Sequence, residues 1–235
     1  MVSMGLKADL EADVKKIYSE RWPRRDGRKV PEDVGLKSGN DAVDIEVTIL
    51  YADLDESTKL VDNYKDWFAA ENYKTFLQCA TKLIRSEGGH IRSFDGDRVM
   101  GVFFGNSKNT SAVRCGLKIH WAVDKIVQPK LKDQYPNTKY VMKHVVGIDT
   151  SKIMVAKAGI RNSNDLVWVG RSANHAAKLS SLSSATPTWI TDKVYDNMHD
   201  SAKYDGNGKN MWEERKWTAQ NNRRIYRSNY TWTLS

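Results

Sequence analysis

One stretch, residues 44–58, constrains the fold more than any other part of the chain. Its first half, residues 45–52, is β-branched and aliphatic, which is typical of a strand buried on both faces. Three acids and two hydroxyls follow: Asp53, Asp55, Glu56, Ser57 and Thr58. Carboxylates at a strand end can hold a hard cation, and backbone N–H groups at the start of the next helix can hold phosphate. A strand followed by an ordinary Ser/Thr helix cap is an equally good interpretation of this stretch alone.

A second stretch, residues 88–104, has the pattern of a β-hairpin with Asp95-Gly96 as its tight turn. This arrangement puts Asp97 at the start of a strand. If that strand pairs with the first, Asp53 and Asp97 lie together, and they repel each other unless a cation bridges them. The competing interpretation is that Asp97 is a residue selected only for turn chemistry.

Composition predicts one well-cored soluble domain with an extension, because 235 residues contain 40% hydrophobic and 28% charged side chains. Cys79 and Cys115 are isolated, which is typical of a reducing compartment. No apolar run approaches a membrane span and no signal core begins the chain, so we expect a cytoplasmic protein without membrane contact. The net charge is +8, but no nucleic-acid motif accompanies it, so we expect no nucleic-acid partner.

The hydrophobic pattern predicts an element order of β-α-α-β-β-α-β-β-α-β-α-β-β after an N-terminal helix at residues 6–20. Its first part, βαββαβ, predicts an α+β fold with a ferredoxin-like core and helices on one face of the sheet. We expect a helix at 110–131 that Pro129 interrupts, two strands in hairpin register at 139–150 and 153–160, and a C-terminal hairpin. Residues 1–42 are expected to form a helical extension and connector, and residues 43–235 the main domain.

Four motifs in this order resemble the class III nucleotide cyclases over roughly residues 45–198. The motifs are Thr-Ile-Leu-Tyr-Ala-Asp-Leu at 48–54, Asp-Gly-Asp at 95–97, Val-Val-Gly-Ile-Asp-Thr at 145–150 and Val-Gly-Arg-Ser-Ala-Asn-His-Ala-Ala-Lys-Leu at 169–179. Any one alone is a weak signal, but the four in order are specific. The details are most similar to the bacterial pyrimidine cyclases of Pycsar anti-phage systems. The resemblance implies that residues 43–235 convert UTP, or CTP, to the 3′,5′-cyclic monophosphate (cUMP or cCMP) and pyrophosphate.

The resemblance also implies roles for individual residues. Asp53, Asp97 and the backbone of Leu54 would hold two divalent ions, Mg²⁺ or Mn²⁺. Asn174 would orient the ribose, and Lys178, where the family has Arg, would stabilise charge on the phosphate. The triphosphate would lie on a turn in which Glu56 replaces the usual glycine; this turn comprises Asp55, Glu56, Ser57 and Thr58.

The base-reading positions depart most from the family. Adenylate cyclases of this class read the purine with a Lys and with an Asp or Thr, and Ser93 (or Arg92, if the register slips) and Val167 stand there instead. Tyr51 shares a strand face with Asp53, so we hypothesise that its phenol fills part of a purine-sized pocket and hydrogen-bonds a smaller base. A core aromatic with a solvated tip is an equal alternative. The missing purine readers favour a pyrimidine, and the family resemblance favours UTP over CTP.

In the family, the metal aspartates and the Asn/basic pair act from opposite subunits. The resemblance therefore implies a homodimer with two shared active sites, and a separate effector that the cyclic nucleotide activates. Two alternatives remain: a class III adenylate or guanylate cyclase, and a non-catalytic cyclase-like module that binds nucleotide. Glu56 and Lys178 favour the non-catalytic alternative, whereas Asp53, Asp97 and Asn174 argue against it.

Overall fold

The computed structural model describes residues 5–32, 35–160 and 162–234. The chain forms two compact units. The first comprises Met1–Ile45 with Lys152–Gly170, and the second comprises Glu46–Ser151 with Arg171–Ser235. The expected extension at residues 1–42 falls within the first unit, and its separation from a domain at 43–235 remains a prediction. Among the described residues, no helix is both long and apolar enough to cross a membrane.

The first unit contains helix α1 and a small group of strands. The N-terminal helix is confirmed as α1 (Leu6–Ser19), and none of its side chains is buried. Strand β1 (Arg24–Asp26) pairs in parallel with the start of β2 (Ala42–Leu54). The Asn40 side-chain amide donates to the carbonyl oxygens of Ile17 and Glu20 at 2.8 and 2.9 Å, which fixes the C-terminal end of α1.

Strand β5 corrects one prediction. Residues 144–160 form a single strand, β5 (His144–Ile160), rather than two strands in hairpin register. Its hairpin partner is β6 (Ser163–Val169), which pairs with Met154–Ile160. The physical reason is turn chemistry: residues 150–152 contain neither Gly nor Pro, whereas Gly159 and Asn162 adopt positive φ angles of 108° and 66°.

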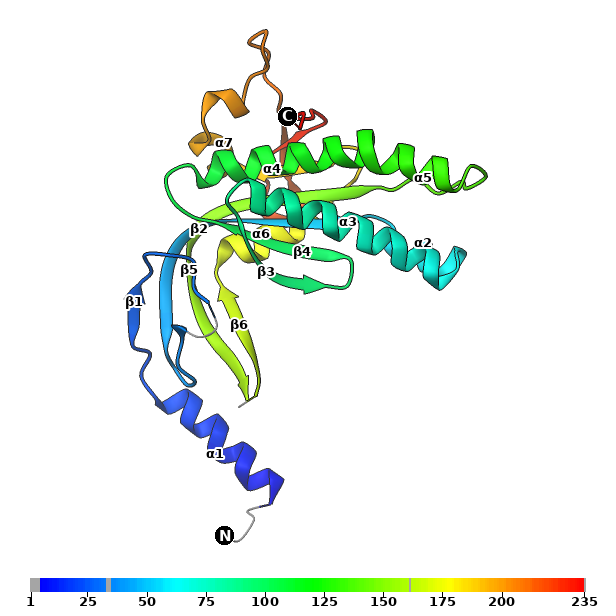
Figure 1. Cartoon of the computed structure of the whole chain (residues 1–235). Helices are drawn as coiled ribbons and strands as arrows, with labels where there is room; N and C mark the ends of the chain where they lie inside the picture. The colour runs from blue at the N-terminus through cyan, green and yellow to red at the C-terminus, as the bar shows by residue number, and fades with distance from the viewer. Residues whose placement is uncertain (1–4, 33–34, 161, 235) are drawn as a thin grey trace. The chain divides into compact units, whose positions relative to one another are not determined.

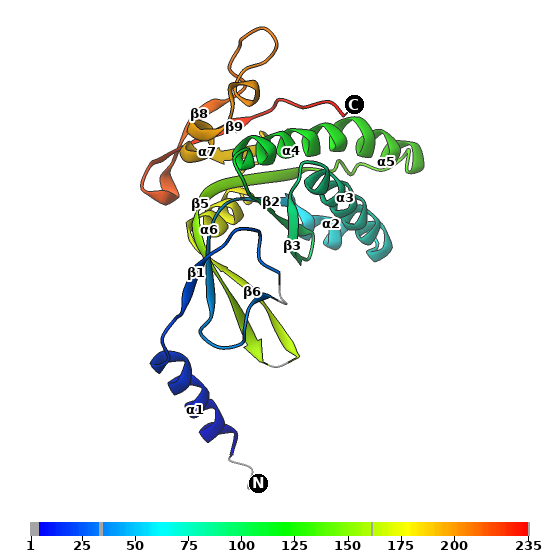
Figure 2. The same cartoon turned by 60° about the vertical axis from the view of Figure 1, so that its left-hand side comes forward.

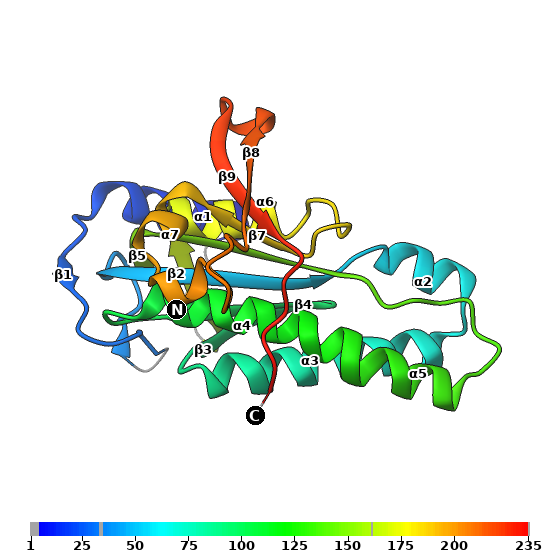
Figure 3. The same cartoon turned by 90° about the horizontal axis from the view of Figure 1, so that it is seen from above.

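The second unit is a sheet with the strand order β3-β4-β2-β5-β7-β9-β8. The predicted order of elements from β2 onward is confirmed, as is the α+β class. Figure 1 shows α3 and α4 on the same side of the sheet, and Figure 3 shows them running beside each other. The remaining elements are α2 (Ser57–Asn63), α3 (Asp66–Ser86), β3 (His90–Asp95), β4 (Arg98–Phe103), α4 (Lys108–Ala122), α5 (Gln128–Gln134), α6 (Arg171–Leu179), β7 (Thr188–Thr191), α7 (Asp192–Asn197), β8 (Glu213–Trp217) and β9 (Arg223–Ser228).

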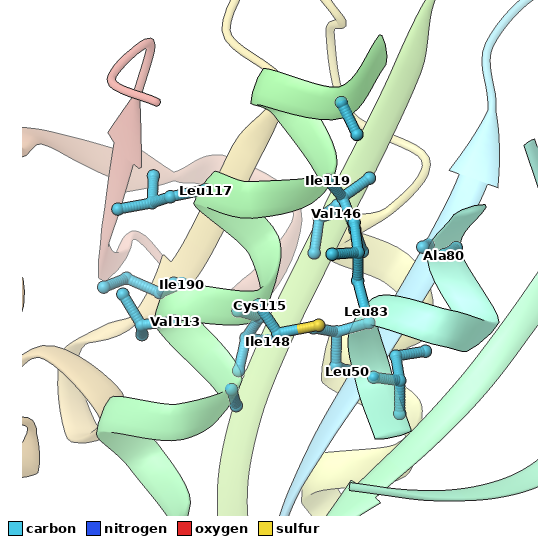
Figure 4. Close-up of a cluster of buried hydrophobic side chains, with 14 of the residues drawn as sticks. Leu50, Ala80, Leu83, Val113, Cys115, Leu117, Ile119, Val146, Ile148 and Ile190 are labelled. Carbon is cyan, nitrogen blue, oxygen red and sulfur yellow. The ribbon is translucent and has the colours of Figure 1, made fainter. Parts of the chain in front are cut away.

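The main core lies between the sheet and helices α3 and α4. Leu50 of β2 and Val146 and Ile148 of β5 are fully buried there. Gly116 of α4 is tightly packed, because a Cβ atom there would lie 3.2–3.5 Å from side-chain atoms of Thr188, Val146 and Ile148. Figure 4 shows Leu50, Val146 and Ile148 packed against side chains of α3 and α4. Burial of this many aliphatic side chains is the dominant stabilising contribution to the second unit.

Helix α6 packs on the other face of the sheet, and it follows the βαββαβ part for which helices on one face were expected. A Cβ atom at Gly147 would lie 2.2 Å from the Ala176 carbonyl oxygen, so only glycine fits beneath α6. Gly147 alternates with Val146 and Ile148 along β5, and side chains that alternate point to opposite faces. A second, smaller core under α6 contains Val145, Leu179, Trp189, Trp217 and Ile225.

Pro129 does not interrupt the helix at residues 110–131. A π-helical turn, Val123–Val127, joins α4 to α5, and Pro129 lies in the first turn of α5. The Gln128 N–H donates to the Val123 carbonyl oxygen, five residues back. Because proline is tolerated at the first positions of a helix, the shift in hydrogen bonding accommodates it without a break.

The C-terminal hairpin is confirmed as β8 and β9. They are joined through Asn221 and Asn222, which both have positive φ. The segment after β9 runs alongside α4 (Figure 2), where the Trp232 N–H donates to the Leu117 carbonyl oxygen at 3.1 Å.

Candidate active site

The two candidate metal ligands lie at the same end of the sheet. Asp53 is the penultimate residue of β2, and β4 pairs antiparallel to β2 with Ala52 opposite Val99. The β3–β4 loop consists of Gly96 and Asp97, between the paired residues Asp95 and Arg98. The predicted turn is therefore shifted by one residue. Gly96 has a φ of 61°, and glycine adopts that conformation without steric cost.

The electrostatics of this pair favour a cation. Burial first, and then the negative charge of Asp97, raise the pKa of Asp53 to about 6. The Oδ2 atom of Asp97 is buried and has no hydrogen-bond partner in the part of the chain that the structure describes. A buried carboxylate oxygen without a partner is costly, and a bound cation would satisfy it and relieve the repulsion.

The donor set fits a divalent ion that substrate also coordinates. Among the described residues, no group of three or more His, Cys, Asp or Glu side chains could hold a metal. Mg²⁺ commonly takes one or two carboxylates and completes its octahedron with water and substrate phosphates. Asp53 and Asp97 supply that number, and Leu54, which follows Asp53 at the end of β2, could add only its carbonyl oxygen.

Arg98 is a site residue that the sequence analysis missed. Arg98 and Asp53 are the next residues beyond the last printed pair of β2 and β4, Ala52 and Val99. The charge of Arg98 lowers the pKa of the Asp53 carboxyl against the larger effect of burial. Its Nη2 atom donates to Asp95 at 2.7 Å, and its guanidinium carbon lies 5.3 Å from the centre of the Tyr51 ring. The available signal was its position directly after Asp97.

The candidate base-binding residues Tyr51 and Ser93 fall in one row across three strands. Tyr51 of β2 is opposite Met100 of β4, which is opposite Ser93 of β3. The Tyr51 hydroxyl donates to the Met100 sulfur at 3.3 Å. Arg92 is the extra residue of a β-bulge between Ile91 and Ser93.

Val167 does not belong to this row. It lies on β6 in the first unit, opposite Ala156, and is 38% exposed.

The turn predicted to hold triphosphate is built around Glu56. Glu56 adopts the left-handed conformation, with φ 59° and ψ 28°, that glycine would adopt there. Its carboxylate accepts hydrogen bonds from Lys59 at 2.5 Å and Lys143 at 2.8 Å. These two lysines hold the pKa of Glu56 at about 2. Lys143, a second residue that the sequence analysis missed, is also tied to the turn, because its carbonyl oxygen accepts from the Asp55 N–H at 3.0 Å.

The alternative of an ordinary Ser/Thr cap is wrong. Glu56 is the N-cap of α2, and no side chain makes a capping hydrogen bond there. Asp55 accepts from the Glu56 N–H at 2.9 Å, which is the behaviour of a turn residue. Ser57 and Thr58 are the first residues of the helix.

Asn174 and Lys178 occupy the solvent-facing side of α6. Both are exposed, whereas Ala173, Ala176 and Leu179 are buried against the sheet. Neither side chain makes a hydrogen bond or ion pair to any residue that the structure describes. In one copy of the chain, the described contacts therefore leave this pair separate from Asp53 and Asp97.

Known proteins resemble the chain in both sequence and fold. It is 51% identical over 232 residues to a uridylate cyclase from Xanthomonas perforans, covering 98% of this chain and 100% of that protein. It is 48% identical to a uridylate cyclase from Burkholderia cepacia, over 98% and 100%. No family model matches the chain.

Two solved structures have the same fold. The adenylyl cyclase CyaB from P. aeruginosa has a TM-score of 0.69 at 19% identity, over 83% of this chain and 99% of that one. The guanylyl cyclase Cya2 has a TM-score of 0.67 at 17% identity, over 80% and 94%. At these identities the likeness shows the fold, which is that of class III nucleotide cyclases. The chain is 51% and 48% identical to the two uridylate cyclases over the full length of those proteins. It is therefore a nucleotide cyclase and belongs to the uridylate cyclase family.

Proposed function

We propose that the chain converts UTP to 3′,5′-cyclic UMP and pyrophosphate. The observation that carries the proposal is the half-buried pair Asp53 and Asp97, in which the Asp97 Oδ2 atom is buried without a partner among the described residues. Asp53 also shares a strand face with Tyr51. Two relatives of this chain are named uridylate cyclases, which supports UTP as the substrate.

The reaction needs one bond formed and one broken at the α-phosphorus. The ribose 3′-hydroxyl oxygen bonds to that phosphorus, and its proton passes to solvent. The bond from the phosphorus to the α,β-bridging oxygen breaks, and pyrophosphate leaves with the electron pair. Divalent ions at Asp53 and Asp97 would acidify the hydroxyl and screen the phosphate charge. Asn174 would hold the ribose, and Lys178 would stabilise the charge that develops on phosphate oxygens.

The turn at Glu56 supports binding of the triphosphate. Glu56 adopts the left-handed conformation that a glycine would adopt, so the backbone of the turn can follow the path that a glycine would give it. Its carboxylate holds Lys59 and Lys143 at the turn. Both ammonium groups could exchange this exposed carboxylate for phosphate oxygens, which carry more negative charge. The departure at Glu56 is therefore compatible with substrate binding.

The row formed by Tyr51, Met100 and Ser93 supports a pyrimidine base. Tyr51 is held from two directions, by its hydrogen bond to Met100 and by the guanidinium of Arg98 over its ring. A fixed phenol narrows the space for a base and leaves oxygen lone pairs free as acceptors. Uracil can donate to such an oxygen through N3–H and cytosine through its N4 amino group, so the phenol fits either pyrimidine, and the names of the relatives favour UTP.

The exposure of Asn174 and Lys178 supports a homodimer with shared sites. These residues have no partner of their own among the described residues, and they would complete the carboxylate site of a second copy. The two-fold symmetry of such a dimer gives two equivalent sites.

The resemblance to Pycsar cyclases supports a role in anti-phage signalling. In that role, the cyclic nucleotide would activate a separate effector in the cytoplasm. A phage-sensitivity assay would test this, with the Asp53→Ala chain as the inactive control.

Product analysis with four nucleotides tests the proposed reaction. Purified protein is incubated separately with ATP, GTP, CTP and UTP, with Mg²⁺ or Mn²⁺, and the products are identified by mass. We expect cyclic UMP from UTP and no product from the Asp53→Ala variant. A cyclic purine as the main product would discard the proposed role of Tyr51, and no product from any nucleotide would contradict the proposal.

A further inference from the structure

Helix α6 is anchored by a buried carboxylate on strand β5. Asp149 is fully buried. Its Oδ1 atom accepts from the Thr191 hydroxyl of β7 at 2.5 Å, and its Oδ2 atom accepts from Arg171 Nε of α6 at 3.2 Å. His175 Nδ1, one turn along the same helix, lies 3.3 Å from Oδ2. The Asp149 side chain thus connects strands β5 and β7 to α6.

Further contacts fix both the position and the rotation of α6. Arg171 Nη2 donates to the Thr150 carbonyl oxygen at 2.6 Å. The His175 ring meets Trp217 edge-on at 5.3 Å between centroids. At Gly147, α6 approaches the strand so closely that no side chain fits. A helix held at its first turn and pressed against the sheet cannot rotate without breaking these contacts.

Asn174 and Lys178 follow Arg171 at the i+3 and i+7 positions of α6, on its exposed side, and neither makes a hydrogen bond or ion pair to a residue that the structure describes. Their direction is therefore set by the helix alone. Burying a carboxylate is unfavourable unless it is fully paired, and here the cationic partner, Arg171, comes from the helix that bears the two proposed catalytic groups. From this geometry we infer that Asp149 is a positioning residue, which holds α6 so that Asn174 and Lys178 face the substrate.

This inference rests on the proposed function of α6, and the chain offers a matched control. The Glu87 side chain is only 4% exposed and pairs with two cations, Arg114 at 2.7 Å and Lys118 at 2.6 Å. These partners lie on α4 rather than α6. Asp149→Asn and Glu87→Gln therefore each remove one buried charge from the second unit, and only the first touches α6.

The first test compares the steady-state kinetics of these two variants. We expect Asp149→Asn to lower kcat by at least about tenfold, because small misplacements of reacting groups have effects of that size. KM should change much less, since the triphosphate turn is untouched. Glu87→Gln should keep a kcat near that of the original chain. An unchanged kcat for Asp149→Asn, or an equal loss in both variants, would overturn the inference.

The second test assigns the defect to one half of the site. Asp149→Asn chains are mixed and allowed to exchange with Asp53→Ala chains or with Asn174→Ala chains. Mixing with Asp53→Ala should recover activity, because one site then combines intact carboxylates with an intact α6. Mixing with Asn174→Ala should recover none. Recovery with both partners, or with Asn174→Ala alone, would contradict a role through α6.

A mixture of Asp53→Ala and Asn174→Ala separates this inference from the proposed function. If that mixture stays inactive although the chains exchange, the shared site fails independently of Asp149.

A third measurement keeps the inference testable if the Asp149→Asn variant folds poorly. Arg171→Gln removes the helix side of the same contact. If Asp149 acts through Arg171, the double variant should lose no more kcat than the worse single variant. Losses that multiply would show independent roles and would overturn the inference.

Discussion

At the scale of single residues, Asp53 combines a cost in stability with a proposed use in catalysis. Burial and the neighbouring Asp97 raise its pKa to about 6 from an ordinary value of 3.8. The folded protein therefore binds this proton more tightly than the unfolded chain does. The resulting stabilisation is complete below about pH 4 and is lost as the pH rises through about 6. Above that pH the ionised carboxylate destabilises the metal-free protein.

Replacing Asp53 by Asn should therefore stabilise the metal-free protein while it abolishes cyclase activity. In thermal unfolding with a chelator at about pH 8, we expect a higher Tm for Asp53→Asn than for the original chain. The difference should shrink as the pH falls from 6 towards 4. Added Mg²⁺ should raise the Tm of the original chain and leave the variant nearly unchanged. A variant that melts lower than the original chain at pH 8 would refute this account of the carboxylate pair.

The conformation and ion pairs of Glu56 could not be predicted from its residue type alone. In the sequence, Glu56 in place of the usual glycine favoured a non-catalytic module. Instead, Glu56 adopts the left-handed conformation itself and pairs with Lys59 and Lys143. Lys143 is 87 residues away in the chain, so no local pattern connects it to the turn.

At the scale of elements, the close approach of α6 to β5 sets the position of Asn174. Gly147→Ala would place a Cβ atom 2.2 Å from the Ala176 carbonyl oxygen. We expect a loss of about 1–3 kcal/mol in the free energy of unfolding, as for overpacked cores, and a lower kcat because α6 must move. Gly206→Ala is the control, since no atom lies within 4 Å of its Cβ position. Equal effects of the two substitutions on kcat would count against the role of α6.

The order of elements could be predicted from the sequence because alternation and helical periodicity are local. The hairpin at Asp97, the helix at Asn174 and the C-terminal strands were all found in this way. Longer-range choices were not predictable. The continuous β5 depends on pairing with β6, and the second helix-covered face depends on Gly147.

The residues of the candidate site fall into the same two groups, those with a local sequence signal and those that depend on long-range contacts. Asp53, Asp97, Asn174 and Lys178 were identified from motifs. Arg98, Lys143 and Asp149 act through cross-strand register or distant ion pairs, which become visible only once the sheet is assembled. Among these three, Arg98 and Asp149 had local signals, the first its place directly after Asp97 and the second its place in the motif at residues 145–150, but neither signal indicates a partner.

At the scale of the whole molecule, the two proposed half-sites of the chain make no described contact with each other. The carboxylate half comprises β2, the β3–β4 hairpin and the turn at Glu56, and the other half is the exposed side of α6. A symmetric dimer would bring each half against its complement in the second copy. Activity should therefore depend on association of the chains.

The measurement that tests this central claim most directly is subunit mixing. Asp53→Ala and Asn174→Ala chains, each inactive alone, are mixed in equal amounts, and cyclic UMP formation from UTP is measured. Random exchange into symmetric dimers predicts recovery of about a quarter of the original activity, since half of the dimers contain one intact site. A mixture that stays inactive, while labelled chains are seen to exchange, would contradict the account.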